Sequence, residues 1–480
     1  MSRPRLVVHA HFYQPFRTDP FTGHVPPDAS ASPFRDWNER VTAECYRPNA
    51  ERGTLEHVSW NLGPTLTAYL ADHAPDVLAG FAASDTSGGG RIGTGPGIAQ
   101  PFHHAILPLA SLHDRRTEIA WGLADFAHRF GRPARAMWLP ETAVDLATLR
   151  IMAEAGVEAT ILAPWQADTS HLDHRRPYRV DTGDGLHIAV LFYDAELSGS
   201  VSFEPNMTAD ADRFARERIA PRMGGSLPDG SGPVLVIASD GELYGHHQSF
   251  RDLFLHRLVA PSETTPDRGF DVVTLASVVD EAAGHPHPEI RIRDRTSWSC
   301  HHGVLRWSAE CPDAADARWK APLRAALERL AGGIDTVTEG LARAFPGLED
   351  IWATRDAFGS VVIGAVEPDA FAAEALGPRA SAEDRHQLLA LLEAHRWRLA
   401  MFSSCGWFWE EPSRPETRQV LRSAARAVRL IDGLAGTDLE ARLVADLALL
   451  MSPAHGIDGS MIYRRALSEV GQPPPREAHD

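Results

Sequence analysis

The chain has 480 residues, 44% of them hydrophobic, and this length predicts two or three domains, or one barrel with an appendage. A formal net charge of −17 argues against a nucleic-acid or anionic-membrane surface, because either would need a clustered excess of positive charge. Lys320 is the only lysine, which excludes mechanisms that need a lysine at a set place, such as a Walker-type phosphate loop or a Schiff base. Lys320 itself stands in a polar, helix-like run, where we expect it to be solvated.

In chain order, short apolar runs predict strands and helical spacing predicts helices. The expected strands cover residues 5–10, 134–139, 159–163, 187–194, 234–238 and 271–275. The expected helices between them cover 64–80, 115–130, 144–155, 209–220, 248–260 and 276–283. Residues 17–64 lack clear periodicity and predict long loops, which are commonly functional. Strands that alternate with helices imply a parallel sheet, and this number of units predicts a complete or incomplete (β/α) barrel.

Beyond about residue 310 the pattern changes. Ala, Leu, Arg and Glu recur with helical periodicity in the segments 313–345, 381–400, 415–434 and 438–451, which predicts a helical bundle. We therefore divide the chain into a catalytic barrel at 1–295, a helical domain at 296–470 and a disordered tail at 471–480.

The four cysteines are Cys45, Cys300, Cys311 and Cys405. They show no CxxC spacing, which argues against a structural zinc site, and so few cysteines do not indicate a disulfide-stapled protein. The apolar run at the N-terminus is too short for a signal peptide, and no run of about 18 apolar residues follows it. We therefore expect a cytoplasmic protein with no membrane and no nucleic-acid partner, and make no prediction of its oligomeric state.

Polar residues follow several of the expected strands. His9, His11, Glu141, Asp194 and Asp240 all stand at strand ends. In barrels of this kind the chemistry lies at the C-terminal ends of the strands. The stretch PVLVIASDGELYGHH at 233–247 shows the pattern best, since a buried strand ends there in two carboxylates and two histidines.

Glu141 in MWLPET and Asp240 in ASDGELYGHH form the best pair of carboxylates. Such a pair can serve as nucleophile and general acid/base for glycosidic cleavage when the two stand opposite each other across the scissile bond. Sugar rings stack on aromatic faces, and Trp138, Trp165 and Tyr244 are available for this. The residue types also allow a second interpretation, in which Glu141 caps the following helix and Asp240 forms a local salt bridge.

His9 and His11 are two residues apart on a strand, so both rings face the same side. They could bind a metal with Asp19 or Asp240 as a further ligand, or they could hydrogen-bond sugar hydroxyls and the nucleophilic carboxylate. Of the neighbours His246 and His247, we expect one to be structural.

The segment TSWSCHHGVLRWSAECP at 296–312 links the two expected domains. Its Trp298, His301, His302 and Trp307 could line the site, or the tryptophans could join the bundle to the barrel. We interpret Cys300 as a small buried hydrophobic residue rather than a nucleophile.

Together these motifs resemble glycoside hydrolase family 57, whose members act on α-glucans through a retaining mechanism on a (β/α)7 barrel followed by helices. HAHFYQP resembles the first motif of the family, AQPFHHAILPL the second, MWLPET the third and SDGELYGHH the fourth, and TSWSCHHGVLRW matches the fifth loosely. The resemblance runs from residue 6 to about 310. The remaining helices resemble a subfamily with its own C-terminal domain of unassigned role.

The resemblance implies an α/β fold, with an incomplete (β/α)7 TIM-like barrel followed by an α-helical bundle. The third motif carries the nucleophile, which would be Glu141, and the fourth carries the general acid/base, which would be Asp240. The residues expected to bind substrate are His9, His11, Trp138, Trp165, Glu242, Tyr244, His246, Trp298 and Trp307. The expected partner is an oligosaccharide or polysaccharide, with no cofactor and no metal.

The sequence therefore predicts a retaining glycoside hydrolase or transglycosylase for α-glucans, of the amylase, branching or 4-α-glucanotransferase type. One alternative is a metal-dependent hydrolase resembling polysaccharide deacetylases, in which His9, His11 and an aspartate hold zinc. Another is a glucan-binding protein that has kept the pocket but not turnover.

Overall fold

The computed structural model describes residues 3–89, 94–225, 227–228, 231–261, 264–265, 267–282, 287–314 and 316–470. The chain forms two compact units. The first comprises Met1–Gln14, Trp37–Gln100 and Arg129–Trp298, and the second comprises Pro15–Asp36, Pro101–His128 and Ser299–Asp480. The segments 15–36 and 101–128 thus belong to the second unit, although both fall within the 1–295 span expected for the barrel. The tail at 471–480 lies outside the described residues.

The strands found among the described residues all lie in the first unit. They are β1 (Arg5–Phe12), β2 (Ser59–Leu62), β3 (Gly97–Ile98), β4 (Ala159–Leu162), β5 (Tyr178–Gly183), β6 (Leu186–Phe192), β7 (Val234–Asp240) and β8 (Asp271–Val272). The parallel order β3-β2-β1-β7 forms one sheet, in which β8 also pairs with β1. In the second sheet β6 is parallel to β4 and antiparallel to β5.

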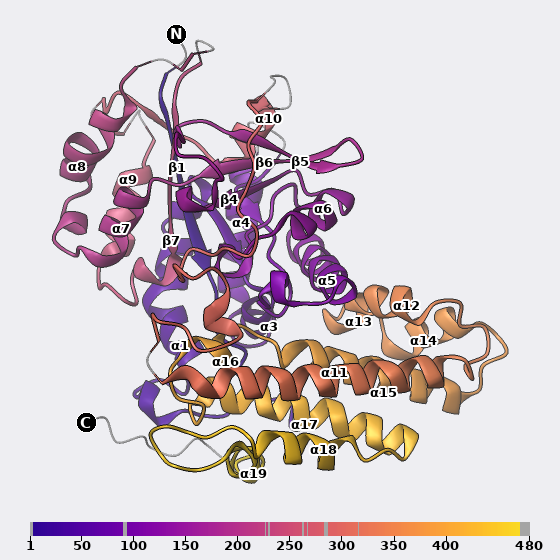
Figure 1. Ribbon diagram of the computed structural model, residues 1–480. Helices are drawn as coiled ribbons and strands as arrows, with labels where there is room; N and C mark the ends of the chain where they lie inside the picture. Colours follow the sequence, from indigo (N-terminus) through magenta and orange to yellow (C-terminus); the bar gives the residue numbers. More distant parts are fainter. Residues whose placement is uncertain are drawn as a thin grey trace. The chain divides into compact units, whose positions relative to one another are not determined.

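Further backbone contacts join the two sheets into a ring. Parallel bridges pair Ala99 with Met137 and Ala136 with Ala159. The strand expected at 134–139 is therefore reduced to an extended segment at 136–137, which lies between β3 and β4. The N–H of Asp194, just after β6, donates to the carbonyl of Val236 in β7 at 2.8 Å. The path β1-β2-β3-(136–137)-β4-β6-β7 therefore returns to β1, and the fold is the predicted incomplete (β/α)7 barrel (Figure 1).

Alternate residues of these strands fill the interior of the ring. The buried cluster includes Val7, Ile98, Ala136, Ile161, Leu191 and Val236. Side chains that come from strands all around the ring can meet only inside it. Because side chains alternate along a strand, His9 and His11 face the same interior as Val7, and Asp240 faces it with Val236.

The helices of the first unit follow the strands and confirm most of the helical predictions. They are α1 (Trp37–Val41), α2 (Arg47–Glu51), α3 (Pro64–His73), α4 (Pro75–Gly89), α6 (Leu146–Glu154), α7 (Ala195–Phe203), α8 (Ala211–Phe214), α9 (Arg251–Val259) and α10 (Leu275–Ala282). The expected loop at 17–64 is wrong in part, since it contains α1, α2 and β2. These elements are only four or five residues long, so their periodicity is too short to read in the sequence.

The second unit is a bundle of helices, as predicted. Its helices are α5 (Leu112–Phe130), α11 (Lys320–Ala342), α12 (Ile351–Ala357), α13 (Gly359–Val362), α14 (Pro368–Leu376), α15 (Ala382–Ala400), α16 (Cys405–Phe408), α17 (Pro415–Ala435), α18 (Leu439–Leu447) and α19 (Gly459–Ser468). Helix α17 packs against α11, α15, α16, α18 and α19 (Figure 1). Pro415 begins α17 and Gly436, with φ of +63°, ends it, which is the common asymmetry of helix termini.

Lys320 is fully buried at the start of α11, so the expectation that it is solvated is wrong. Its ammonium group lies 5.7 Å from the centre of the Trp319 ring. Burial lowers the pKa of Lys320 to about 8, which still leaves most of this group charged at neutral pH.

In the part of the chain that the structure describes, no helix is both long enough and apolar enough to cross a membrane.

Candidate active site

Three neighbouring strands bring the first site residues together. In the register of the sheet, His11 of β1 stands beside Asn61 of β2 on one side and Asp240 of β7 on the other. The strands are parallel, so these residues share the C-terminal edge of the sheet. Backbone pairing of the three strands therefore places these residues side by side at the C-terminal edge, where the sequence predicts the active site.

The two histidines share one polar partner. Oδ1 of Asn61 lies 3.2 Å from Nε2 of His9 and 3.1 Å from Nδ1 of His11, and Nδ2 of Asn61 donates to Oε1 of Gln100 at 2.6 Å. Burial lowers the pKa of His9 to about 3 and that of His11 to about 4. Both imidazoles are therefore neutral at physiological pH and can act only as hydrogen-bonding groups.

Trp138 forms the support behind the histidines. Its ring stacks on His9 with centroids 4.5 Å apart and on His11 at 5.4 Å, and the residue is fully buried. A ring covered in this way offers no face to a sugar. Trp138, which the sequence predicts to bind substrate, therefore lies at the site but supports the imidazole rings of His9 and His11.

Glu141 stands in a strained turn at the end of the segment that follows Met137. Its backbone is left-handed, with φ of +55° and ψ of +22°, and Thr142 follows with φ of +47°. For residues other than glycine this conformation costs about 1–2 kcal/mol each, and such strain persists where the surroundings enforce it, often at functional sites.

Two residues enforce this turn. Oε1 of Gln166 accepts from Oγ1 of Thr142 at 2.9 Å, and Nε2 of Gln166 donates to the Thr142 carbonyl at 2.8 Å. Trp298 donates twice to Glu141, from its backbone N–H to the carbonyl and from its indole Nε1 to Oε2, each at 3.0 Å. The Glu141 carboxylate is thus aimed by contacts from two distant parts of the chain.

Asp240 is the last residue of β7 and is accessible to solvent, whereas the six residues before it are buried. Protein atoms crowd the carboxyl group nevertheless. The resulting loss of hydration, followed by the negative charge of Glu141, raises the pKa of Asp240 to about 7. The two carboxylates are therefore close enough to interact, and Asp240 is half protonated near neutral pH.

Glu242 follows Asp240 by two residues in the sequence and is buried. Its Oε1 accepts from the backbone N–H of Tyr13 at 3.0 Å and from the hydroxyl of Tyr46 at 2.5 Å. Burial is the largest cause that raises the pKa of Glu242 to about 8, and the charge of Asp240 adds to it. Glu242 therefore connects the end of β7 to Tyr13 and Tyr46 by hydrogen bonds. Its environment favours the neutral acid.

The remaining predicted aromatic residues lie in different places. Trp298 is half-buried and meets Trp138 edge-on at 5.1 Å and Tyr193 at 6.4 Å. Trp165 is 40% exposed, and its ring meets that of Tyr193 at 6.1 Å. Tyr244 is buried, with its hydroxyl 3.1 Å from Oγ of Ser239. Trp298 and Trp165 are thus partly exposed, whereas Tyr244 is buried and contacts Ser239 of β7.

Three other candidates do not join the carboxylate pair. Nδ1 of His246 pairs with Glu44. Trp307 is buried and belongs to the second unit. Asp194 caps α7 by accepting from the N–H of Leu197 at 2.9 Å.

The sequence did not single out Asn61, Gln166 or Tyr193. Asn61 lies in a strand of four residues, and Gln166 lies in the three-residue helical turn Pro164–Gln166. Both segments are too short to show a periodic pattern in the sequence. Gln100 lies inside the motif AQPFHHAILPL, which was the one available signal for it.

The donor set at the histidines does not match a zinc site. Among the described residues, no group of three or more metal-ligating side chains includes His9 or His11. Asp19, one of the two further ligands suggested beside Asp240, uses Oδ1 to accept from the N–H groups of Phe21 at 2.8 Å and Thr22 at 3.2 Å. The geometry therefore favours hydrogen bonding over metal binding by His9 and His11.

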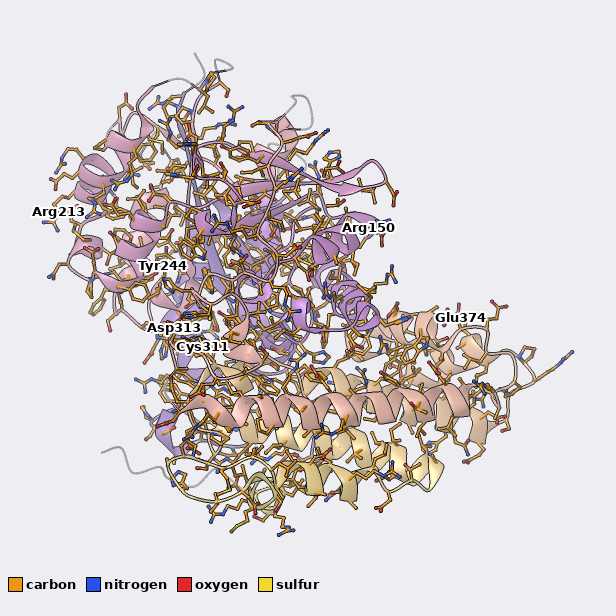
Figure 2. The ribbon with its side chains drawn as sticks, in the orientation of Figure 1. Arg150, Arg213, Tyr244, Cys311, Asp313 and Glu374 are labelled. Carbon is orange, nitrogen blue, oxygen red and sulfur yellow. The ribbon has the colours of Figure 1, made fainter. Side chains whose placement is uncertain are left out.

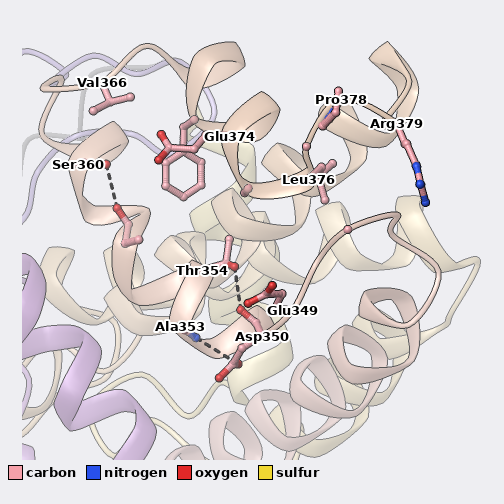
Figure 3. Close-up of a pocket in the computed structure, with 15 residues that line it drawn as sticks. Glu349, Asp350, Ala353, Thr354, Ser360, Val366, Glu374, Leu376, Pro378 and Arg379 are labelled. Carbon is pink, nitrogen blue, oxygen red and sulfur yellow. Dashed lines mark hydrogen bonds between the residues drawn. The ribbon is translucent and has the colours of Figure 1, made fainter.

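The second unit contains a cavity of about 960 Å³ among α12, α13 and α14 (Figure 3). Three of its polar side chains, those of Asp350, Thr354 and Ser360, form hydrogen bonds within the helices. Oγ1 of Thr354 donates to the Asp350 carbonyl at 2.7 Å, and the Asp350 carboxylate accepts from the N–H of Ala353 at 3.2 Å. The hydroxyl of Ser360 likewise donates to the Ala357 carbonyl at 2.8 Å. The candidate site is therefore placed in the barrel.

Two family models match the chain. Residues 93–290 match glycosyl hydrolase family 57, and residues 316–470 match a domain of unknown function, DUF3536. The second match fits the expected C-terminal domain without an assigned role. No curated protein matches the sequence.

Several solved structures share the fold. An exo-type maltose-forming amylase from Pyrococcus sp. ST04 has a TM-score of 0.72 at 15% identity, and the match covers 96% of this chain and 88% of that one. A 4-α-glucanotransferase from Thermococcus litoralis has a TM-score of 0.57 at 17% identity over 89% of this chain and 60% of that one. A family 57 branching enzyme from Pyrococcus horikoshii has a TM-score of 0.55 at 14% identity over 98% of this chain and 94% of that one.

The barrel match, the shared fold and the motifs at the strand ends agree with one another. The barrel region at 93–290 therefore belongs to glycosyl hydrolase family 57, and the chain is an enzyme of the glycoside hydrolase and transferase class.

Proposed function

We propose that this enzyme is a retaining hydrolase or transglycosylase of α-glucans, with Glu141 as nucleophile and Asp240 as general acid/base. The observation that carries the proposal is the pairing of these carboxylates at the strand ends. The charge of Glu141 helps to raise the pKa of Asp240 to about 7. A retaining glycosidase needs one protonated carboxyl group as acid beside an ionised carboxylate as nucleophile, and the raised pKa of Asp240 suits the acid role.

In the first step Glu141 attacks the anomeric carbon and forms a covalent glycosyl ester. The bond from that carbon to the leaving oxygen breaks, and Asp240 donates its proton to this oxygen. In the second step Asp240 takes a proton from water or from an acceptor hydroxyl, which displaces Glu141. For a mechanism that retains the anomeric configuration, we expect the two carboxyl groups to be about 5–5.5 Å apart.

The neutral histidines fit this scheme. An imidazolium beside the pair would stabilise both carboxylates and lower the pKa of Asp240. Because the pKa values of His9 and His11 are about 3 and 4, they bring no such charge at neutral pH. We propose that they hydrogen-bond sugar hydroxyls, while Trp298 offers a stacking surface.

The substrate class is supported by the structural neighbours. Their names include a maltose-forming amylase, a 4-α-glucanotransferase and a branching enzyme. The net charge of −17 suits an uncharged carbohydrate better than an anionic ligand. The four free cysteines support a reducing, cytoplasmic compartment for the reaction.

The test is incubation of the full chain with a panel of α-glucans and oligosaccharides, with the products resolved by size, linkage and anomeric configuration. We expect Glu141→Gln to abolish turnover while the protein stays folded. The matched control is Glu289→Gln, whose side chain is 64% exposed and pairs with Arg179, and which should leave turnover unchanged. Full activity of the Glu141→Gln variant on the true substrate would contradict the mechanism.

A second experiment identifies the nucleophile directly. Glu141→Ala should regain turnover of an activated α-glycoside when azide is added, because azide takes the place of the missing carboxylate. The product should then be the β-glycosyl azide, since only one displacement has occurred. An α-azide would assign the nucleophile elsewhere.

A further inference from the structure

We propose that Cys300, His302, Cys311 and Asp313 form a structural zinc site in the second unit. One ligand atom from each of these four side chains lies within 4.8 Å of all the others. Figure 2 shows Cys311 and Asp313 at this place. The site lies between the two ranges matched by family models, 93–290 and 316–470, so neither description assigns it.

Two similar turns present the ligands in pairs. The N–H of Gly303 donates to the carbonyl of Cys300 at 3.1 Å, and the N–H of Ala314 donates to that of Cys311 at 2.8 Å. In each turn the first and third residues are ligands, which gives the pairs Cys-x-His and Cys-x-Asp. Gly303 has a φ of +79°, a conformation that glycine adopts without strain. The turns therefore aim both pairs at one point.

Three of the six distances between the ligand atoms are close to the edges of a tetrahedral zinc site. The Sγ atoms of Cys300 and Cys311 are 3.5 Å apart, Sγ of Cys311 is 3.6 Å from Nδ1 of His302, and this nitrogen is 3.2 Å from Oδ2 of Asp313. Zinc binds sulfur at about 2.3 Å, and nitrogen and oxygen at about 2.0–2.2 Å. The tetrahedral edges that follow are about 3.8 Å for two sulfurs, about 3.6 Å for sulfur and nitrogen and about 3.3 Å for nitrogen and oxygen.

The charge at the site also suits a bound cation. Zinc with two thiolates, one carboxylate and a neutral imidazole carries a net charge of −1, from +2 and −3. Lys320, the single lysine of the chain, is fully buried and lies within electrostatic range of both cysteines, together with Arg306 and Glu410. Among the described residues its Nζ has no hydrogen-bond partner. A buried ammonium group here would balance the remaining negative charge.

Four protein ligands leave no open position, which is typical of a structural rather than a catalytic zinc site. Cys300 and Cys311 are buried, whereas His302 and Asp313 are exposed. The ion would fix residues 300–313 just before α11 begins at Lys320. The absence of CxxC spacing does not exclude this site, because each turn supplies only one cysteine.

The test measures metal in the full-length chain purified without added metal or chelator. We expect about one zinc per chain, lost from both Cys300→Ser and Cys311→Ser. His302→Ala should also lose zinc, and its matched control is His301→Ala, the neighbouring exposed histidine, which should keep it. His9→Ala should keep zinc too, and loss of the metal from that variant would overturn the assignment.

Cobalt exchange tests the same site without any variant. Cobalt(II) in the wild-type chain should give a thiolate-to-metal charge-transfer band and the intense visible bands of tetrahedral coordination. Absence of the thiolate band would overturn the proposal. So would a Cys300–Cys311 disulfide, found by mass spectrometry in protein that was purified with reductant and then freed of it under nitrogen.

Discussion

The indole Nε1 of Trp298 donates a hydrogen bond to Oε2 of Glu141 at 3.0 Å. The backbone N–H of Trp298 also donates to the carbonyl of Glu141 at 3.0 Å. The last residue of the first unit therefore holds both the carboxylate and the strained backbone of the proposed nucleophile. Trp298 thus positions Glu141, in addition to its proposed role as a stacking surface for a sugar ring.

Trp298→Phe tests this positioning. The variant keeps an aromatic ring against Trp138 and loses the donor to Glu141. A hydrogen bond to a charged acceptor contributes about 1.5–3 kcal/mol, so we expect kcat/KM to fall about 10- to 100-fold. Most of the loss should be in kcat, because the bond orients the group that attacks.

The control for this variant is Trp165→Phe. The indole of Trp165 donates to the carbonyl of Ser297 at 2.9 Å, so the same substitution removes a hydrogen bond that does not reach a carboxylate. We expect a change in KM with little change in kcat. Equal losses of kcat in both variants would speak against the positioning role of Trp298.

The pH dependence of the reaction follows from Asp240. Its pKa is raised to about 7, and the protonated form is the proposed acid of the first step. We expect kcat/KM to fall as the pH rises through about 7. Asp240→Asn should lose activity on natural glucans but keep some on aryl glycosides, whose leaving groups need little protonation. Activity that rises above pH 8 would contradict this assignment.

Glu141→Gln should also change the titration of Asp240. Burial is the larger cause of the raised pKa, and the charge of Glu141 is the second. Removing that charge should lower the pKa of Asp240, yet leave it above the ordinary value of 3.8. Carbon NMR titration of labelled aspartate in the folded variant measures this shift, and an unchanged pKa would show that the two groups do not interact.

Glu242 should make stability fall with rising pH. Its pKa is about 8 in the folded protein against an ordinary value of 4.5, so the folded state favours the neutral acid. This contribution is complete below about pH 4.5 and is lost as the pH rises through about 8. Glu242→Gln has no charge to bury, so its Tm relative to wild type should increase between these pH values.

The control for Glu242→Gln is Glu217→Gln, whose side chain is 57% exposed. Its Tm should follow that of the wild type at every pH. If the Tm difference between Glu242→Gln and wild type does not change with pH, the carboxyl group is not held neutral by its surroundings.

Gln166 should be needed for the turn at Glu141. Besides its two bonds to Thr142, its Oε1 accepts from the N–H of Ala163 at 2.8 Å. Gln166→Ala leaves these buried groups unpaired, so we expect a loss of about 1–3 kcal/mol in unfolding free energy and a lower kcat. Gln166→Glu keeps the acceptors and should restore part of kcat. Gln387→Ala, on the surface of α15, is the control for both measurements.

The sequence by itself determined the strand that carries Asp240 and the strand that carries the two histidines. The apolar run 234–238 predicts a buried strand, and β7 extends it to Asp240. Alternation along β1 predicts that His9 and His11 face one side, and both share Asn61 and stack on Trp138. These are local properties, and parallel strands bring their C-terminal ends to one edge whatever their order in the sheet.

Only the tertiary structure decided which aromatic rings remain accessible and which segments form each unit. Trp138 and Trp165 have the same side chain, yet one is fully buried and the other is 40% exposed. The segments 15–36 and 101–128 precede much of the barrel but belong to the helical unit. Cys300 and Cys311 lack a recognised spacing and meet because two turns face each other. Each of these outcomes depends on contacts between residues far apart in the chain, and such contacts leave no periodic pattern in the sequence.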